Sequence, residues 1–412
     1  MGNAALTGDT PFAKNYARQV LQLSHGKGVW LWDANGNRYL DMGAGIAVNA
    51  LGYGNRRLAR IVERQMRRLV HVSNLYATPP AIELGGRLLG LATGVGRAPF
   101  AAVHFGSSGA EANEAAIKYA RLYALAQRGE GHHRILSFGR GFHGRTMGAL
   151  SATPNPAYRR KFEPLVPGFE TTPFNDPGSF EKILDDTFAA VIVEVVQGEG
   201  GLTVIAPEMV DRLNTLCAER GVLLIADEIQ TGLGRLGEYF GSTAVGLRPD
   251  IITLSKPLAG GLPLSATLIP AAVNDEIALG DHGTTFGGGP VTSAAALHIL
   301  DRLTRDGFLE TIRRRAGELE SGLSSLVDRF DFVEGLCGLG MLRGLKINLG
   351  DRQTDLYPEI LNRARDIGLI VLRSGADVIR IAPPLVITSR ELQTGLHRLE
   401  HTLESINARR HV

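Results

Sequence analysis

The stretch Ile251-Ile252-Thr253-Leu254-Ser255-Lys256-Pro257-Leu258-Ala259-Gly260-Gly261 joins an apolar run to a glycine-rich turn. The β-branched and apolar residues Ile251 to Leu254 predict a strand that is covered on both faces. Pro257 and the glycine pair prevent its continuation, so Lys256 stands at the strand's end. A half-buried ammonium is costly there, and we expect a lowered pKa or a covalent partner. Such an amine suits Schiff-base chemistry, although an ordinary lysine extending from a strand end fits the same stretch.

The composition is typical of a soluble globular protein of two or three domains, with 412 residues, 44% hydrophobic and 21% charged. A net charge of +2 gives no reason to expect nucleic acid or a membrane as a partner. Cys217 and Cys337 lie in apolar stretches, and no secretory signal or membrane-spanning run is recognised. We therefore expect a cytoplasmic protein. His132-His133 has no companion ligand at a metal-binding spacing, so no metal site is predicted.

Strand and helix patterns alternate from about residue 80 to 300, which indicates a mostly parallel sheet with helices on both faces. Helices are expected at Ala110–Ala126 and Pro207–Arg220. Residues 290–330 predict a long connecting helix, and 335–405 predict a smaller α+β domain. The expected strands are Ala101–Phe105, Arg134–Phe138, Ala189–Val196, Val222–Ala226, Ile251–Leu254 and Ser265–Ile269.

The chain is expected to divide into an N-terminal segment (1–55) that joins the small domain, a large domain (56–304) and a small C-terminal domain (305–412). Residues 1–28 predict an extended lead-in, and Gly28–Met42 predicts a hairpin that turns at Asn35-Gly36. The glycine-rich segment 335–340 is interpreted as a boundary. A helix over Asn55–Leu69 would carry one apolar face, formed by Leu58, Ile61, Val62, Met66 and Leu69.

Three further stretches place reactive side chains at strand ends. Ser107-Ser108-Gly109-Ala110-Glu111 opens a helix whose free N–H groups suit a phosphate, unless they merely belong to a well-capped helix. An apolar run delivers Asp227 to a strand's carboxyl end, where it would pair with a protonated ring nitrogen or cap a turn. Phe142 and Arg145 offer an aromatic face and a carboxylate clamp, or else a packed loop and a solvated arginine. His143, between them, is interpreted as hydrogen-bonded structure.

The segment Gly232-Leu233-Gly234-Arg235-Leu236-Gly237 matches G-x-G-x-x-G, and Asp250 follows 18 residues after Gly232. A dinucleotide site is nevertheless not predicted. Asp227 to Thr231 separate the glycines from the strand, and Glu238-Tyr239-Phe240-Gly241 does not open a helix, so the required context is missing.

In order and spacing, these motifs resemble the class III aminotransferases, pyridoxal-phosphate enzymes of fold type I, and most closely the acetylornithine aminotransferases. The resemblance runs from about residue 12 to the C-terminus. It implies an α/β large domain, with a mostly parallel central sheet and helices on both faces, and a smaller α+β domain. The matching segments are 45–52, 108–114, 142–146, 197–201, 227–232, 255–261, 282–288 and 380–384.

The resemblance implies a role for each cofactor-binding residue. Lys256 would be the Schiff-base lysine and the proton shuttle, and Asp227 would pair with the pyridinium nitrogen. Gln230 would bond the phenolic oxygen, while Phe142 and Ile229 would cover the two ring faces. The phosphate would be held by N–H groups at Ser108, Gly109 and Ala110, and by Thr285 of a second subunit in a homodimer.

The resemblance also implies how two substrates share one site. Arg145 would bind the substrate α-carboxylate, and Thr284 would also be a substrate-binding residue. Glu199 would mask Arg380 when a diamino donor binds and release it for 2-oxoglutarate or glutamate. Tyr16 and, more weakly, Tyr76 would line the distal end of the substrate, or else be ordinary core or surface tyrosines.

The implied activity is transfer of the terminal amino group of N-acetylornithine, or a similar ω-amino donor, to 2-oxoglutarate by a ping-pong mechanism in arginine biosynthesis. The chain departs from the family pattern at Val195 (usually Pro), Gly289 (usually Asn) and Tyr53 (often His). These departures leave the donor open. A 4-aminobutyrate, ornithine or other diamine transaminase, an aminomutase, and a non-catalytic binding protein of this fold are the alternatives.

Overall fold

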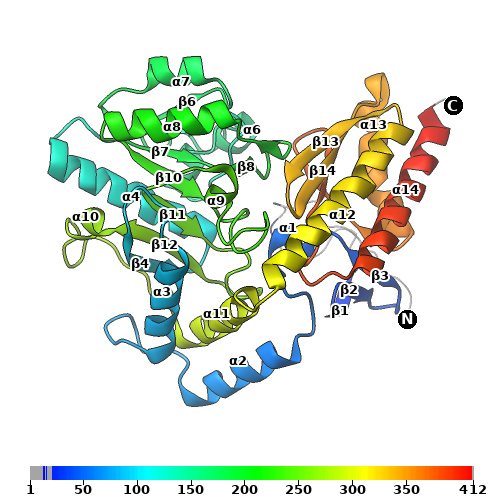
Figure 1. The fold of residues 1–412 in the computed structure, drawn as a ribbon, viewed down its shortest axis with the longest axis horizontal. Coiled ribbons are helices and arrows are strands. Elements are labelled where there is room, and N and C mark those ends of the chain that lie inside the picture. Colours follow the sequence, from blue (N-terminus) through cyan, green and yellow to red (C-terminus); the bar gives the residue numbers. More distant parts are fainter. Residues whose placement is uncertain (1–12, 14, 16–20, 411–412) are drawn as a thin grey trace.

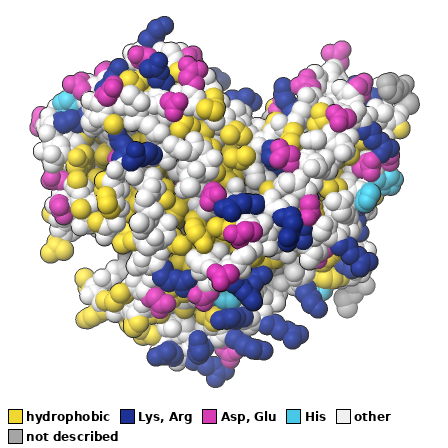
Figure 2. Space-filling model, viewed as in Figure 1, with side chains coloured by type: hydrophobic (Ala, Val, Ile, Leu, Met, Phe, Trp, Pro, Cys, Tyr) yellow, Lys and Arg dark blue, Asp and Glu magenta, His cyan; other side chains and the backbone are white. Residues whose placement is uncertain are grey.

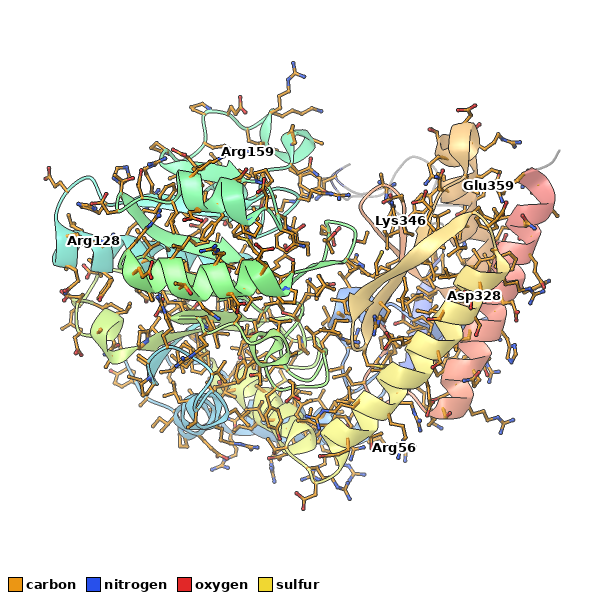
Figure 3. The ribbon with its side chains drawn as sticks, turned by 45° about the horizontal axis from the view of Figure 1, so that its top comes forward. Arg56, Arg128, Arg159, Asp328, Lys346 and Glu359 are labelled. Carbon is orange, nitrogen blue, oxygen red and sulfur yellow. The ribbon has the colours of Figure 1, made fainter. Side chains whose placement is uncertain are left out.

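The computed structural model describes residues 13, 15 and 21–410, which form a large and a small lobe (Figure 1). Arg128 and Arg159 mark the large lobe in the turned view, and Lys346 and Glu359 mark the small one (Figure 3). The C-terminal helix lies on the small lobe beside the first strands of the chain (Figure 1). None of the helices in the described residues is both long and apolar enough to cross a membrane.

In the described part of the chain, the large lobe is built on a seven-stranded sheet of order β4-β12-β11-β10-β7-β5-β6. β12 runs antiparallel to β4 and β11, and the other pairs are parallel, so the mostly parallel sheet is confirmed. β6 was not predicted, because Phe-Glu-Thr-Thr has no apolar run. The strands are β4 (Phe100–Gly106), β5 (Arg134–Phe138), β6 (Phe169–Thr172), β7 (Phe188–Val193), β10 (Leu223–Asp227), β11 (Ile251–Leu254) and β12 (Ser265–Pro270).

Helices cover both faces of this sheet, which is why its central strands are buried and largely apolar. Ile225 and Ile251 pack with α4 (Gly109–Arg128) on one face. Their neighbours Leu224 and Ile252 pack in the main core on the other face, where α7 and α8 lie. The remaining helices of this lobe are α3 (Pro79–Leu91), α5 (Met147–Ser151), α6 (Pro156–Arg159), α7 (Pro177–Ile183), α8 (Pro207–Glu219), α9 (Gly241–Val245) and α10 (Ala271–Asn274).

Three helices run along the base of the molecule and between the lobes (Figure 1). They are α2 (Arg56–Arg68), α11 (Pro290–Leu303) and α12 (Phe308–Arg329). Residues 290–330 are helical as predicted, and α12 is the long connecting helix; Gly307 adopts a left-handed conformation (φ 74°) and separates it from α11. α2 begins after Asn55, whose side chain caps the helix by accepting from the backbone N–H groups of Arg57 and Leu58.

The small lobe contains two sheets, ordered β1-β2-β3-β15 and β13-β14-β17-β16 in the described residues. Parallel pairing of β3 with β15 ties the first strands to the C-terminal part of the chain. The elements are β1 (Leu23–Lys27), β2 (Trp30–Asp33), β3 (Arg38–Asp41), α1 (Ala44–Ala47), β13 (Val333–Leu339), β14 (Leu342–Ile347), η1 (Gly350–Arg352), α13 (Gln353–Asp366), β15 (Leu369–Ile370), β16 (Leu372–Ser374), β17 (Val378–Ile381) and α14 (Ser389–Arg410). A short hairpin, β8 (Val196–Gln197) and β9 (Thr203–Val204), follows β7.

Two local predictions in these regions are wrong. The extended lead-in includes β1, which pairs with β2. The expected two-residue turn is a longer loop, because the Asp33 carboxylate accepts from the N–H groups of Asn35 and Asn37, both at 2.9 Å. The glycine-rich segment 335–340 lies in β13 and the turn after it, where it does not mark a boundary.

Candidate active site

Asp227 and Lys256 lie at the carboxyl edge of the large sheet, at the ends of adjacent parallel strands. Asp227 is the last residue of β10 and pairs in register with Thr253 of β11. Lys256 follows two residues after β11 ends, beyond Ser255, whose hydroxyl donates to the Leu264 carbonyl at 3.0 Å. This edge is where parallel α/β sheets bind ligands. The two groups singled out in the sequence are therefore brought to one place.

The buried Asp227 carboxylate is held by a network that the sequence did not reveal. Its Oδ2 accepts from Asn113 Nδ2 at 2.8 Å and lies 2.7 Å from His143 Nδ1. Asn113 also donates to the His143 carbonyl and accepts from the Thr253 hydroxyl. Burial lowers the pKa of His143, but the hydrogen bond and charge of Asp227 outweigh burial and raise it overall. Asp227 is thus fixed in position by two side-chain partners.

The electrostatics at Lys256 favour a neutral amine. Burial is the largest cause and the positive charge of Arg380 the next, and together they lower the lysine pKa to about 8. The carboxylates of Glu199, Glu194 and Asp227 raise it and offset part of the effect. An amine with this pKa is available as a nucleophile or base at moderately alkaline pH.

The first turn of α4 forms a cradle with free backbone donors. Ser108 caps the helix by accepting from Glu111 N–H, and no described residue accepts from the N–H groups of Gly109 or Ala110. A Cβ at Gly109 would lie 2.8 Å from Ile229 Cδ1, so only glycine allows Ile229 to pack this closely. Two free N–H groups at the positive end of a long helix are suited to a phosphate.

Phe142 and Arg145 lie in the loop after β5, and their neighbour Tyr158 was not predicted. The Phe142 N–H donates to Glu194 Oε1 at 2.8 Å. The exposed Arg145 guanidinium lies 3.5 Å from the ring centre of Tyr158 and 5.5 Å from that of Phe142. Phe142, Tyr158 and Glu199 line one cavity of about 430 Å³. Arg145 is therefore held beside a cavity at the edge of the site.

The predicted pair of Glu199 and Arg380 is present and closed. Arg380 Nη1 donates to Glu199 Oε1 at 2.7 Å and to the Gly198 carbonyl at 3.0 Å. It also lies 3.4 Å from Gln230 Oε1. Arg380 is buried, whereas the Glu199 side chain is about a third exposed. Glu199, the more exposed member of the pair, can therefore move without disturbing the residues that pack around Arg380.

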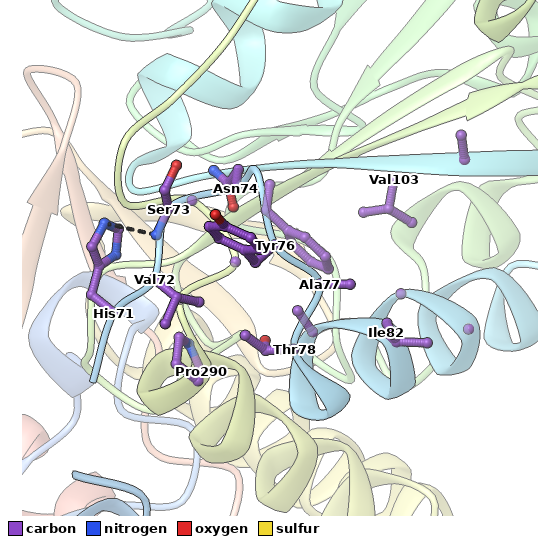
Figure 4. A pocket seen from close by; sticks show the side chains of 18 of the residues that line it. His71, Val72, Ser73, Asn74, Tyr76, Ala77, Thr78, Ile82, Val103 and Pro290 are labelled. Atoms are coloured by element: carbon purple, nitrogen blue, oxygen red, sulfur yellow. Dashed lines mark hydrogen bonds between the residues drawn. The ribbon is translucent and has the colours of Figure 1, made fainter. Parts of the chain in front are cut away.

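Thr285 lies elsewhere in the chain. It is exposed and lines a cavity of about 370 Å³. Residues 71–74 and 76–78 line the same cavity (Figure 4), whereas Lys256, Asp227 and Ser108 do not. Tyr76 borders the same cavity with its side chain largely in solvent. The neighbouring Thr284 carbonyl accepts from Asn74 Nδ2 at 2.8 Å. Tyr16 lies outside the described residues.

The three departures from the family pattern occupy different surroundings. Val195 is fully buried, and its carbonyl accepts from Ile205 N–H. The Tyr53 hydroxyl donates to Asp41 Oδ2 at 2.5 Å. Gly289 precedes α11 and borders the same cavity as Thr285. Of the three, only Gly289 lies beside a residue with a predicted role in the site.

Several contributing residues were missed because their role is visible only in three dimensions. Asn113 lies within a quoted helix start, but helical spacing does not show that it reaches a carboxylate on another strand. Glu194 is buried and accepts from the N–H groups of Phe142 and Gly198. Burial raises its pKa to about 7, the charge of Asp227 adds to this, and His143 opposes it. A buried glutamate directly after an apolar strand was the available signal.

These groups fit pyridoxal phosphate. The free N–H groups of Gly109 and Ala110 suit its phosphate, the buried Asp227 suits its ring nitrogen, and the Lys256 amine suits its aldehyde. The narrow space between Gly109 and Ile229 is formed without side-chain clashes only because residue 109 is glycine. Among the described residues, no group of His, Cys, Asp and Glu side chains could hold a metal ion.

Residues 12–403 match the family model described as aminotransferase class-III, so the chain belongs to that family and is a pyridoxal-phosphate-dependent aminotransferase of fold type I. Among similar curated proteins are the acetylornithine aminotransferase of Caldanaerobacter subterraneus (39% identity, 95% of this chain and 96% of that one) and a probable mitochondrial acetylornithine aminotransferase of Dictyostelium discoideum (40%, covering 97% and 87%). Among solved structures are the ornithine aminotransferase of Toxoplasma gondii (TM-score 0.90, 30% identity, covering 96% and 93%) and the N-acetylornithine aminotransferase of Stenotrophomonas maltophilia (TM-score 0.81, 31%, covering 95% and 98%).

Proposed function

We propose that this aminotransferase transfers the terminal amino group of N-acetylornithine, or a closely similar ω-amino donor, to 2-oxoglutarate in two half-reactions at one site. The observation that carries the proposal is the closed pair of Glu199 and Arg380 beside Lys256. A site that takes an amine lacking a second carboxylate and then a dicarboxylate needs an arginine that can be covered and uncovered. The names of the similar curated proteins support the same donor.

Bound pyridoxal phosphate supplies an electron sink for the carbanion formed when the substrate loses a proton. We propose that the first turn of α4 holds the phosphate and that Asp227, oriented by His143 and Asn113, keeps the ring nitrogen protonated. Phe142 and Ile229 would enclose the ring, and Gln230 would bond its phenolic oxygen. Enclosure excludes water, which strengthens the charge pairing with Asp227.

Lys256 carries the proton in this proposal. Its Nζ would remove the proton from the substrate carbon and then deliver it to the aldehyde carbon of the cofactor. The lowered pKa makes the neutral amine accessible, and the surrounding carboxylates stabilise the ammonium that forms briefly. A lysine of ordinary pKa would be almost wholly protonated at neutral pH and would be a poor base.

In this proposal Arg145 and Arg380 bind different substrate carboxylates. Arg145, stacked on Tyr158, presents its guanidinium beside the cavity of Phe142 and Glu199 and would bind the donor's α-carboxylate. Arg380 would stay covered by Glu199 in that half-reaction. When 2-oxoglutarate enters, Glu199 would move toward solvent, and Arg380 would take up a carboxylate.

We further propose a homodimer in which Thr285 of each subunit completes the partner's phosphate site. In one chain α2 is formed as predicted, but it buries none of its residues. Exposed apolar side chains extend from this helix to the cavity of Thr285, namely Met66, Leu69, Val70, Leu75, Tyr76, Ile82 and Phe286. A contiguous apolar surface of this kind is typical of a protein interface.

Two further proposals concern organisation and location. The division at 55/56 and 304/305 is supported by the pairing of β3 with β15 and by the break between α11 and α12. A cytoplasmic location is supported by Cys217 and Cys337, which are both free.

The proposal is tested by a donor screen on the purified holoenzyme. Glutamate formation from 2-oxoglutarate is measured separately with N-acetylornithine, ornithine and 4-aminobutyrate, and the highest kcat/KM is expected with N-acetylornithine. Preference for either of the other donors would place the chain with another ω-transaminase activity. Lys256→Ala should abolish turnover with every donor and remove the visible absorption band of covalently held cofactor, whereas Lys161→Ala, at an exposed loop position, should change neither.

A further inference from the structure

A second polar cavity lies at the base of the molecule, where the large lobe meets the segment that follows Arg380. Its volume is about 380 Å³. None of the groups assigned to the active site lines it. The lining residues are Leu51, Asn55, Arg57, His298, Asp301, Arg302, Arg305 and Val386.

The charge in this cavity is unbalanced. Among the described residues no carboxylate pairs with Arg57, Arg302 or Arg305, whereas Asp301 is already bound by Arg87 at 2.6 Å. The positive end of α2 adds to this charge, since Asn55 and Arg57 belong to its first turn. Lys and Arg side chains gather along this lower edge of the molecule (Figure 2), and Arg56 is labelled there in Figure 3.

His298 supplies an independent sign that a ligand belongs here. Its side chain projects from α11 and only 7% of the residue is exposed. Neither ring nitrogen has a hydrogen-bond partner within the described residues. A buried polar atom left without a partner costs roughly 1–3 kcal/mol, so an imidazole with two such atoms is an unusual core residue. A bound molecule that offers oxygen atoms would satisfy it.

We propose that this cavity binds a small oxyanion, a phosphate or sulfate group that is either free or carried on a metabolite. Guanidinium groups pair with such anions through charge-assisted hydrogen bonds, and three of them line the cavity around one imidazole. Burial and the charges of Arg57 and Arg302 lower the pKa of His298, and Asp301 opposes them, so these surroundings disfavour a further positive charge. A bound anion would offset the repulsion between the positive groups.

The position of the cavity gives the anion a structural role. Val386 follows Leu385, whose N–H donates to the Ala50 carbonyl at 2.8 Å, so the cavity borders a contact between the segment that follows Arg380 and residues 50–51. Arg57, Arg302 and Arg305 belong to α2, to α11 and to the connection after α11. An occupied cavity therefore joins elements that meet at the junction of the lobes.

Binding is tested on the holoenzyme, so that the phosphate cradle of α4 is already filled. Sulfate is titrated calorimetrically in a phosphate-free buffer at constant ionic strength. Arg57→Gln with Arg305→Gln removes two exposed cavity arginines, and Arg64→Gln with Arg68→Gln removes the same charge from positions on α2 outside the cavity. We expect roughly tenfold or greater weakening with the first pair and less than twofold with the second. Equal weakening by both pairs, or no binding that depends on Arg57 and Arg305, would overturn the proposal.

His298→Phe tests the unpartnered imidazole separately. Without sulfate, Tm should stay the same or rise, because two unsatisfied nitrogen atoms are replaced by carbon. The increase in Tm that sulfate gives the unsubstituted protein should be lost. A lower Tm without sulfate, together with an unchanged sulfate effect, would show that the ring has other partners and would refute the site. Titration of glycerol 3-phosphate beside inorganic phosphate decides whether the anion is free or esterified, since the tighter binder identifies the source.

Discussion

The carboxyl edge of the large sheet and the apolar face around Thr285 differ in how complete they are within one chain. At the sheet edge, Asp227 is buried, hydrogen-bonded on both sides and within electrostatic range of Lys256. At the other region, Leu75 is 87% exposed and Phe286 is 69% exposed, and Thr285 faces an open cavity. The fold of a single subunit is enough to place Asp227 and Lys256, the groups expected to hold and transfer protons. Thr285, which is expected to complete the phosphate site, needs a second subunit to do so.

The two regions should therefore respond differently to substitution. Changes at the sheet edge act on the reacting groups themselves and should lower kcat without altering assembly. Changes on the apolar face act through association and should depend on protein concentration. Four predictions follow this division, beginning with the largest effect.

Asp227→Ala should lower kcat by about 10³-fold or more, because it removes the buried carboxylate that balances the ring charge. It also leaves Asn113 and His143 without their shared acceptor. Asp250 provides a matched control, since it is a buried carboxylate just before β11, at the opposite end of the strands, and is paired with Arg97. Asp250→Asn should lower Tm but leave kcat within a few fold. An Asp227→Ala enzyme with normal kcat would contradict the assigned role.

Leu75→Asp with Phe286→Asp should disrupt the apolar face and produce monomers with roughly 10²-fold lower activity, because charges replace apolar area at the proposed interface. Sedimentation velocity measures the assembly state, and activity is followed over a range of enzyme concentrations. Phe162→Asp is the control, since Phe162 is also a phenylalanine and 59% exposed but follows α6 and is not one of the residues of the apolar face. A fully active monomer would show that one chain suffices.

Lys256→Met should stabilise the cofactor-free protein by up to about 3 kcal/mol at neutral pH, although it abolishes turnover. The folded-state pKa of about 8 lies below the ordinary value of 10.5, so the folded protein disfavours the proton. The cost is fully present below pH 8 and disappears as pH rises toward 10.5. The stability difference from the unsubstituted protein, measured by urea unfolding, should therefore shrink over that interval. Lys161→Met should give no such pH-dependent difference.

The sheet edge could be predicted from the sequence because local pattern determines it. The apolar runs before Asp227 and Lys256 fix two strands, and parallel neighbours bring their ends together. The contact between His143 and Asp227 could not be predicted, because the two residues are 84 positions apart in the sequence. His143 lies in the loop after β5, and Asp227 is the last residue of β10. Tyr158 lay in no motif. The wrong prediction at Asp33 and the break at Gly307 within the predicted helical region have another cause. A side chain that bonds nearby backbone and a single left-handed glycine each redirect the chain within a few residues.

The apolar face of α2 illustrates a different limit. Its periodicity predicted the helix correctly, but periodicity cannot say whether the apolar face packs inside the subunit or against a second one. Leu58, Ile61 and Val62 are half-buried, and Met66 is more than half exposed. The pattern alone thus predicts the helix, but only the three-dimensional structure shows which surface its apolar face packs against.

Glu199→Gln probes the boundary between the two kinds of region, because Glu199 is partly exposed while its partner Arg380 is buried. Removing the negative charge uncovers Arg380 permanently, so KM for 2-oxoglutarate should fall. KM for N-acetylornithine should rise by roughly tenfold, since an unpaired buried guanidinium now faces a donor without a second carboxylate. Glu170→Gln serves as a control, because that carboxylate lies on the outer strand β6 and pairs with Arg134 of β5. Opposite shifts in the two KM values, with kcat little changed, distinguish a substrate switch from a purely structural ion pair, which would shift both values in the same direction.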